Sequence, residues 1–215
     1  MGNPRVTRAR GEEPKQQIQP GSRCLLVVEG NDECVLAKRV GLPQGTTVLD
    51  LGGMDDGTKL EQYATVVGLD PSFFALTSVG VVVDAEGDAA FALKHAQAFL
   101  ARLGYPVPTG PGEIAKEASR TGGIFILPDG KSPGALETLQ RQAVGAERAA
   151  CVDALFACTG RPPAWNHAQR DKAWIRAYAA TVDARARGDQ LYGPAPKLDT
   201  RHAAFTAFRE WLGRL

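Results

Sequence analysis

The sequence lacks several features that would place it in a special class of protein. No apolar run approaches the roughly 20 residues of a membrane-spanning helix, and no apolar segment follows the basic N-terminal stretch, which argues against a secretory signal. The few cysteines form no CxxC pair, have no histidine at zinc-ligand spacing, and are unneeded as staples in a chain of 215 residues. We therefore expect a soluble, cytoplasmic protein with reduced, mostly buried thiols. The cysteines are Cys24, Cys34, Cys151 and Cys158.

The whole chain also lacks a large excess of charge of one sign, although its segments differ in net charge. Lys and Arg number 25 against 24 Asp and Glu, which gives a net charge of +1. The net charge is +3 over residues 1–23, −7 over residues 24–160 and +5 over residues 161–215. An acidic centre suits cation binding, and basic flanks suit a polyanion such as nucleic acid. Charged faces are also commonly just solvated, so this alternative stays open.

Apolar runs that alternate with helical patterns predict the fold. Runs at residues 24–28, 46–51, 79–83 and 123–127 are typical of buried strands, and the segments between them have the period of amphipathic helices. Such alternation implies right-handed crossovers and a mainly parallel sheet. We predict a doubly wound α/β fold with a four-stranded, mainly parallel sheet and a helical C-terminal extension.

The predicted organisation has three parts. Residues 1–22 hold Gly, Pro and Gln without periodicity and end in a Pro-Gly breaker pair, which predicts a disordered leader. Residues 23–145 form the α/β domain. Residues 146–158, 165–182 and 200–215 have helical periodicity, so we expect residues 146–215 to form a helical extension that packs on the same core.

Carboxylates follow the C-terminal ends of three predicted strands, although the third, Asp129, lies in a Pro-Asp-Gly turn that favours Asp in any case. In the stretch SVGVVVDAEGD, Asp84 closes an apolar strand, and Glu86 points to the same side because side chains alternate along an extended chain. Glu29 follows the first strand and has no helix-capping role to explain it. Open α/β sheets bind ligands in the crevice outside the strand ends. Glu29 and Asp84 would share one cation if their strands were neighbours, about 5 Å apart.

The chemistry of these side chains favours a hard cation. Carboxylates held close together repel one another unless protons or a divalent ion intervene. Oxygen ligands select Mg²⁺ or Mn²⁺ over zinc. Asp88 lies near the same strand end, but it is also the natural N-cap of the helix that begins at Ala89.

The same residues resemble a known domain. The VEG motif around Glu29 and the DAE motif from Asp84 to Glu86 are similar to the Toprim domain of primases, topoisomerases and related nucleases, whose pattern is a strand-end Glu and a strand-end DxD. The resemblance implies a Toprim-like fold and a Mg²⁺ or Mn²⁺ cofactor. It places the Glu of the family at Glu29 and its first Asp at Asp84. Either Glu86 or Asp88 would supply the remaining carboxylate.

More of the chain, from the first strand to the C-terminus, is similar to a small family of Toprim-like proteins of unknown function. The segments GIFILPDG, GALE and DKAW carry this resemblance, at residues 123–130, 134–137 and 171–174. Toprim nucleases of the overcoming-lysogenization-defect (OLD) group use a later Glu for a second metal and a later Lys near the scissile phosphate. By that analogy Glu137 would hold a second metal, and Lys172 would be catalytic.

The sequence thus predicts Mg²⁺- or Mn²⁺-dependent phosphoryl transfer on nucleic acid, with nuclease-like chemistry. Paired ions help phosphodiester hydrolysis because one activates water and the other neutralises the leaving oxygen. The expected partners are DNA or RNA and a protein such as an ATPase. The predicted catalytic residues are Glu29 and Lys172, and the predicted metal ligands are Glu29, Asp84, Glu86, Asp88 and Glu137.

Two other classes of protein stay open at this point. The first is a non-catalytic Toprim-like module that binds a metal, a nucleotide or a protein partner as a regulatory subunit. The short chain and the altered DxD motif favour it. The second is a pure scaffold, which would neither bind ions nor cleave nucleic acid.

Overall fold

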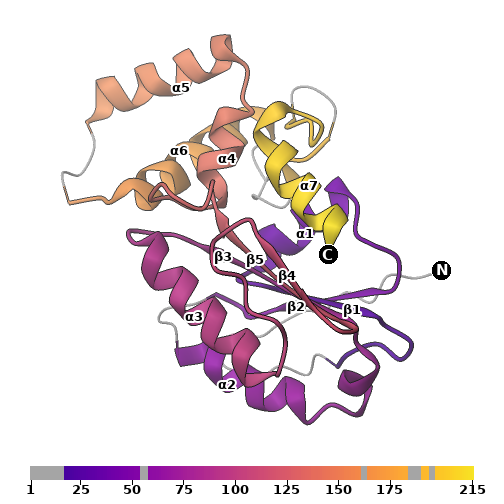
Figure 1. The fold of residues 1–215 in the computed structure, drawn as a ribbon. Coiled ribbons are helices and arrows are strands. Elements are labelled where there is room, and N and C mark those ends of the chain that lie inside the picture. The colour runs from indigo at the N-terminus through magenta and orange to yellow at the C-terminus, as the bar shows by residue number, and fades with distance from the viewer. Residues whose placement is uncertain (1–16, 54–57, 161–163, 184–189, 194–196) are drawn as a thin grey trace.

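The computed structural model has an α/β fold and describes residues 17–53, 58–160, 164–183, 190–193 and 197–215 (Figure 1). The strands are β1 (Cys24–Val28), β2 (Thr46–Asp50), β3 (Ser78–Asp84), β4 (Ile114–Glu117) and β5 (Arg120–Leu127). The helices are α1 (Asn31–Val40), α2 (Thr58–Gly68), α3 (Ala89–Arg102), α4 (Leu136–Gln142), α5 (Ala146–Thr159), α6 (His167–Val182) and α7 (Thr206–Arg214), with short 3₁₀ helices η1 (Pro71–Ala75) and η3 (Ala203–Phe205).

The five strands form one sheet in the order β2-β1-β3-β5-β4. The first four are parallel neighbours, and β4 pairs antiparallel with β5 at the edge. The predicted α/β class, with its four parallel strands and C-terminal helices, is confirmed, and β4 adds a fifth strand. Because β2 lies on one side of β1 and β3 on the other, the chain reverses direction across the sheet between β1 and β3. Ligands of open α/β sheets bind at such a switch point.

Helices cover both faces of the sheet. Helices α2 and α3 lie on one face, while α1, α4, α6 and α7 lie on the other (Figure 1). Side chains alternate along β1, so Leu25 and Val27 enter the first core and Leu26 and Val28 enter the second. Burying each such aliphatic side chain stabilises the fold by about 1.5–3 kcal/mol. This double burial is why the strands are continuous apolar runs in the sequence.

A close approach fixes helix α7 against the strand that carries Asp84. Gly80 of β3 has no side chain, and a Cβ atom there would lie 2.3 Å from Leu215 and 3.1 Å from Trp211. Trp211 is fully buried and contacts Phe125 of β5, with the two ring centroids 5.5 Å apart. The C-terminal helices therefore share a core with the sheet.

The predicted leader, residues 1–22, lies mostly outside the described residues. The described part, residues 17–22, packs on the domain. Ile18 is buried, and its backbone N–H donates to Oδ2 of Asp70 over 2.9 Å. Ser22 is also buried and shares a hydrogen bond with the hydroxyl of Thr47. Apolar Ile18 reaches the core although the residues around it have no helical or strand periodicity.

The cysteines are less buried than the sequence predicts. Cys24 is buried in β1 as predicted, and Cys34 is half-buried. Cys151 and Cys158 are exposed, so the prediction of mostly buried thiols is wrong for these two. The reason is that α5 buries only Val152 completely, which leaves both thiols on its outer side.

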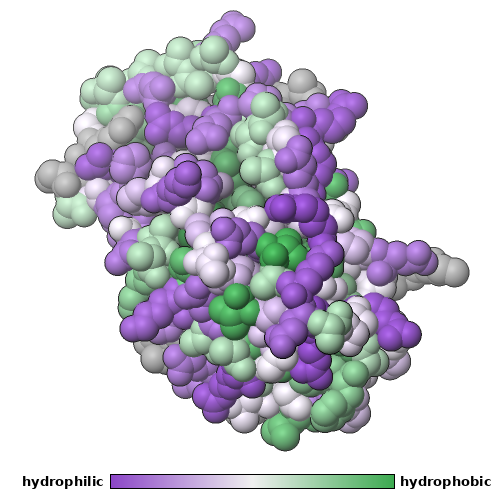
Figure 2. All heavy atoms as spheres, in the orientation of Figure 1, coloured by the Kyte–Doolittle hydropathy of each residue, from purple (hydrophilic) through white to green (hydrophobic). Residues whose placement is uncertain are grey.

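The surface contains hydrophilic side chains over most of the face in Figure 2, with smaller hydrophobic patches between them. In the part of the chain that the structure describes, no helix combines the length and the apolar character needed to cross a membrane.

Candidate metal centre

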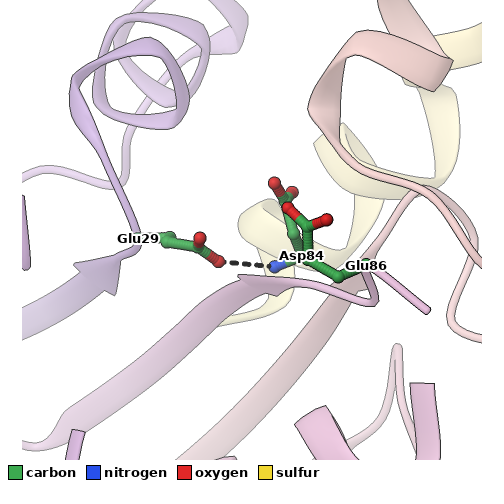
Figure 3. Close-up of side chains that lie close together, drawn as sticks. All are labelled: Glu29, Asp84 and Glu86. Atoms are coloured by element: carbon green, nitrogen blue, oxygen red, sulfur yellow. Dashed lines mark hydrogen bonds between the residues drawn. The ribbon is translucent and has the colours of Figure 1, made fainter. Parts of the chain in front are cut away.

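Parallel pairing of β1 and β3 brings Glu29 and Asp84 together. The two strands are hydrogen-bonded neighbours, with Val28 opposite Val82. Glu29 follows the last residue of β1, and its Oε2 accepts a hydrogen bond from the backbone N–H of Asp84 over 3.1 Å (Figure 3). Two acids that are 55 residues apart in the sequence thus lie side by side at the switch point.

Asp84 is the buried member of the site, with a residue exposure of 7%. Its Oδ1 accepts a hydrogen bond from the backbone N–H of Leu136 over 3.0 Å, at the start of α4. Burial and then the negative charges of Glu33 and Glu29 hold the pKa of Asp84 well above its usual range. Loss of contact with water and nearby negative charges both disfavour the ionised form of this carboxyl.

Glu86 reaches the same place from the turn after β3. Its backbone has a φ of 48°, an uncommon conformation for a residue with a side chain. Two backbone hydrogen bonds to Gly134 hold that turn, over 2.7 and 2.9 Å. The turn directs the carboxylate of Glu86 to the same side as that of Asp84 (Figure 3).

These three carboxylates form a group suited to a cation. One oxygen from each of Glu29, Asp84 and Glu86 lies within 4.8 Å of the others. All the donors are carboxylate oxygens, which are the ligands that Mg²⁺ and Mn²⁺ prefer. Their mutual repulsion would be relieved by a bound cation. The donor set therefore fits the cofactor that the Toprim resemblance implies.

Lys172 of α6 supplies a positive charge to this group. Its Nζ lies 2.5 Å from Oε1 of Glu86 and 3.9 Å from Oδ2 of Asp84. Burial alone would lower the pKa of Lys172, but the hydrogen bond to Glu86 and the charge of Glu137 outweigh burial and raise it. Lys172 is therefore an ammonium ion at the site.

The two remaining predicted ligands lie outside the group of three. Asp88 caps α3, because its Oδ1 accepts hydrogen bonds from the backbone N–H groups of Ala90 and Phe91, over 2.9 and 3.1 Å. Glu137 is half-buried in the first turn of α4. Burial, opposed by the charge of Lys172, raises the pKa of Glu137 to about 7. Glu137 remains a prediction as a metal ligand, whereas the hydrogen bonds of Asp88 favour the capping role, which is the alternative that the sequence left open.

Glu33 is a site residue that the sequence reasoning missed. It lies in the first turn of α1 with only 7% exposure. Burial, with smaller contributions from the charges of Glu29 and Asp32, raises the pKa of Glu33 to about 8. Acidic residues are common in the first turn of a helix, so nothing about the type of this residue indicated that it would be buried near the carboxylates. The available signal was its spacing from Leu36 and Ala37, which places Glu33 on the buried face of that helix.

The acid at the end of β5 has a structural role. Oδ1 of Asp129 accepts hydrogen bonds from the backbone N–H groups of Lys131 and Ser132, over 2.9 and 2.7 Å. The hydroxyl of Ser132 donates to Oδ2 over 2.8 Å. Asp129 thus closes the turn after the strand.

Comparisons with known proteins give a match to a family model that spans most of the chain. The model of the family DUF3226, a protein family of unknown function, matches residues 23–215. No curated protein matches. Two solved structures of the C-terminal region of the Xanthomonas campestris pv. campestris OLD protein are similar. The one phased with platinum has 16% identity and a TM-score of 0.44, over 89% of this chain and 92% of that chain. The one phased with iodine has 17% identity and a TM-score of 0.41, over 89% and 94%.

Proposed function

The chain belongs to the DUF3226 family, and we propose that it is a Mg²⁺- or Mn²⁺-dependent phosphoryl-transfer enzyme of nuclease type that acts on DNA or RNA. The observation that carries this proposal is the convergence of Glu29, Asp84 and Glu86 within 4.8 Å. The group lies at the end of a parallel sheet, where α/β folds bind ligands. The Toprim resemblance, which rests on the same residues, supports the proposal.

The residues have distinct roles in this proposal. Asp84 and Glu86 hold the cation together with Glu29, whose carboxylate is fixed by the N–H of Asp84. A bound divalent ion would supply a more acidic water and a positive charge for the phosphate oxygens. Glu29 would also accept a proton from an attacking water. Glu137 and Glu33 would release their protons to hold a second cation.

Lys172 acts on the substrate in this proposal. Its ammonium lies beside Asp84 and Glu86 with the side chain 31% exposed, so it can turn toward a bound phosphate. A fixed positive charge next to a reacting phosphate stabilises the charge that develops in the transition state.

One observation favours the alternative of a non-catalytic, metal- or partner-binding module. Lys172 already neutralises part of the acidic group through its ion pair with Glu86. A site balanced in this way can persist without turnover, as in a regulatory subunit that assembles with an ATPase.

The test is cleavage of supercoiled, linear and single-stranded nucleic acid with Mn²⁺ by the wild type, Glu29→Gln and Asp84→Asn. We expect cleavage by the wild type and a loss of at least about a hundredfold in both variants. Asp88→Ser, which keeps a capping oxygen on α3, is the matched control and should cleave normally. Ion binding without cleavage by the wild type would favour the non-catalytic module.

A further inference from the structure

A buried carboxylate joins the two helices that meet at the metal centre. Asp171 of α6 has 3% exposure. Its Oδ2 accepts a hydrogen bond from the hydroxyl of Thr138 over 2.8 Å, and its Oδ1 accepts one from Nη1 of Arg141 over 3.0 Å. Both donors belong to α4. Burying a charge is unfavourable unless it is paired and hydrogen-bonded, so these two contacts keep α6 on α4.

On the α4 side, the hydrogen bonds between Asp171 and α4 connect to the carboxylates of the metal centre. Thr138 gives its only hydroxyl hydrogen to Asp171, and its oxygen accepts the backbone N–H of Ala135 over 3.2 Å. The neighbouring backbone N–H of Leu136 binds Oδ1 of Asp84. Thr138 therefore holds both Asp171 and the segment that contacts the buried ligand.

The α6 side of the link leads to the same carboxylates. The residue after Asp171 is Lys172, whose Nζ contacts Glu86 and lies 3.9 Å from Oδ2 of Asp84. The two oxygens of Asp84 are thus approached from two helices, Oδ1 from α4 and Oδ2 from α6. The Thr138–Asp171 contact joins these two helices next to the carboxylates.

The ion pair of Lys172 is too weak to place this side chain alone. The side chains of Lys172 and Glu86 are 31% and 43% exposed, and ion pairs at this exposure contribute little to stability. The conformational entropy that a lysine side chain loses when it is ordered outweighs such a pair. If helix α6 already holds the backbone of Lys172 next to the carboxylates, the side chain loses less conformational entropy when it forms the ion pair.

We propose that Asp171 is a positioning residue that acts through Thr138 to hold Lys172 of α6 over the carboxylates of the metal centre. This inference rests on the proposed function in one respect, because it gives Lys172 its catalytic use. The position of Lys172 itself can be measured without any metal or substrate.

The first experiment measures acylation of Lys172 by an amine-reactive ester, followed by mass spectrometry of the full-length, metal-free protein. Exposed Lys94 is the internal reference. We expect Thr138→Val to raise the labelling rate of Lys172 about fivefold relative to Lys94, as loss of one hydrogen bond predicts. Thr138→Ser keeps the hydroxyl and should restore the wild-type rate. An unchanged rate in folded Thr138→Val would overturn the inference.

A matched control separates positioning from general loosening. The hydroxyl of Thr65 accepts a hydrogen bond from Arg102 over 3.0 Å and so joins α2 to α3 on the opposite face of the sheet. Thr65→Val should leave the labelling of Lys172 unchanged, and an equal rise there would contradict specific positioning by Thr138. If Thr138→Val does not fold, Asp171→Asn provides the same measurement, because an amide can accept from only one of the two donors.

The second experiment uses the proposed activity. Thr138→Val should lower kcat for Mn²⁺-supported cleavage about tenfold with little change in KM, and Thr138→Ser should restore it. A wild type without cleavage would remove the proposed function but leave the labelling result to decide the position of Lys172. Cleavage that is normal in Thr138→Val, with Lys172 labelled faster, would overturn the catalytic use of this link.

Discussion

The carboxylate of Glu29 accepts a hydrogen bond from the backbone N–H of Asp84 across the switch point between β1 and β3. The contact fixes one acid of the site directly against the backbone of another. Asp84 is buried, and its pKa is raised by burial and by its acidic neighbours. Carboxyls with raised pKa values bind protons more tightly than free ones, so binding of a divalent ion would release protons.

Asp84→Asn removes one of the three converging carboxylates without changing the size of the side chain. We expect at least about a tenfold loss of Mn²⁺ affinity, because the buried ligand provides charge that a neutral amide does not. Glu29→Gln should have an effect in the same direction. Isothermal titration with Mn²⁺ measures both. Wild-type affinity in either variant would exclude that residue from the site.

Asp88 is predicted to affect stability and to leave ion binding unchanged. Asp88→Ala removes the N-cap of α3 and should lower the free energy of unfolding by about 1 kcal/mol. Urea denaturation measures this loss, and Asp88→Ser should recover most of it. If Asp88→Ala instead lowered the Mn²⁺ affinity by about tenfold, Asp88 would be a ligand as the sequence first suggested.

The metal-free protein is predicted to lose stability as the pH rises from about 5 to about 8. Burial raises the pKa of Glu33 from 4.5 to about 8 and that of Glu137 from 4.5 to about 7. The folded chain therefore keeps protons that the unfolded chain has already released. Stability is fully present below the unfolded pKa and is lost as the pH passes the folded pKa.

Chemical denaturation across this pH range, with a chelator present, measures the effect. Glu33→Gln is neutral at every pH and should flatten the dependence. Added Mn²⁺ should recover stability most at the alkaline end, where the carboxylates are ionised. A wild type whose stability rises with pH over this range would contradict the burial of Glu33 as a protonated acid.

Lys172→Met separates ion binding from catalysis. Lys172 and a divalent ion compete for Glu86, so the variant should bind Mn²⁺ up to about fivefold more tightly, given the small contribution of a partly exposed pair. Cleavage should fall about a hundredfold, because the positive charge beside the phosphate is gone. Lys94→Met, on the exposed side of α3, is the control. Weaker Mn²⁺ binding in Lys172→Met would show that Lys172 supports the ligands and does not compete for them.

Strands β1, β3 and β5 could be predicted because their apolar runs are buried on both faces of the sheet. The first strand was placed at its observed bounds, Cys24–Val28, and the strand that ends at Asp84 within one residue at each end. The edge strand β4 (Ile114–Glu117) was missed, since it is short, only partly buried and follows a loop rich in Pro and Gly. The strand β4 is stabilised by its antiparallel pairing with β5, and no pattern within its own residues predicts it.

Part of the site could be read from the chain, and part depends on tertiary contacts. Glu29 and Asp84 were identifiable because acids at the ends of apolar strands stand out. Helix α4 begins at Leu136, later than Pro133 where the sequence suggested, because Gly134 pairs with the backbone of Glu86. The approach of Lys172 to this turn follows from packing of α6 on α4, which no local pattern encodes.

The most direct measurement is an anomalous difference map from crystals soaked in Mn²⁺. The account predicts a peak bounded by the carboxylates of Glu29, Asp84 and Glu86, with Lys172 displaced from Glu86. Manganese bound elsewhere in the same crystals, with no peak among these three carboxylates, would contradict it.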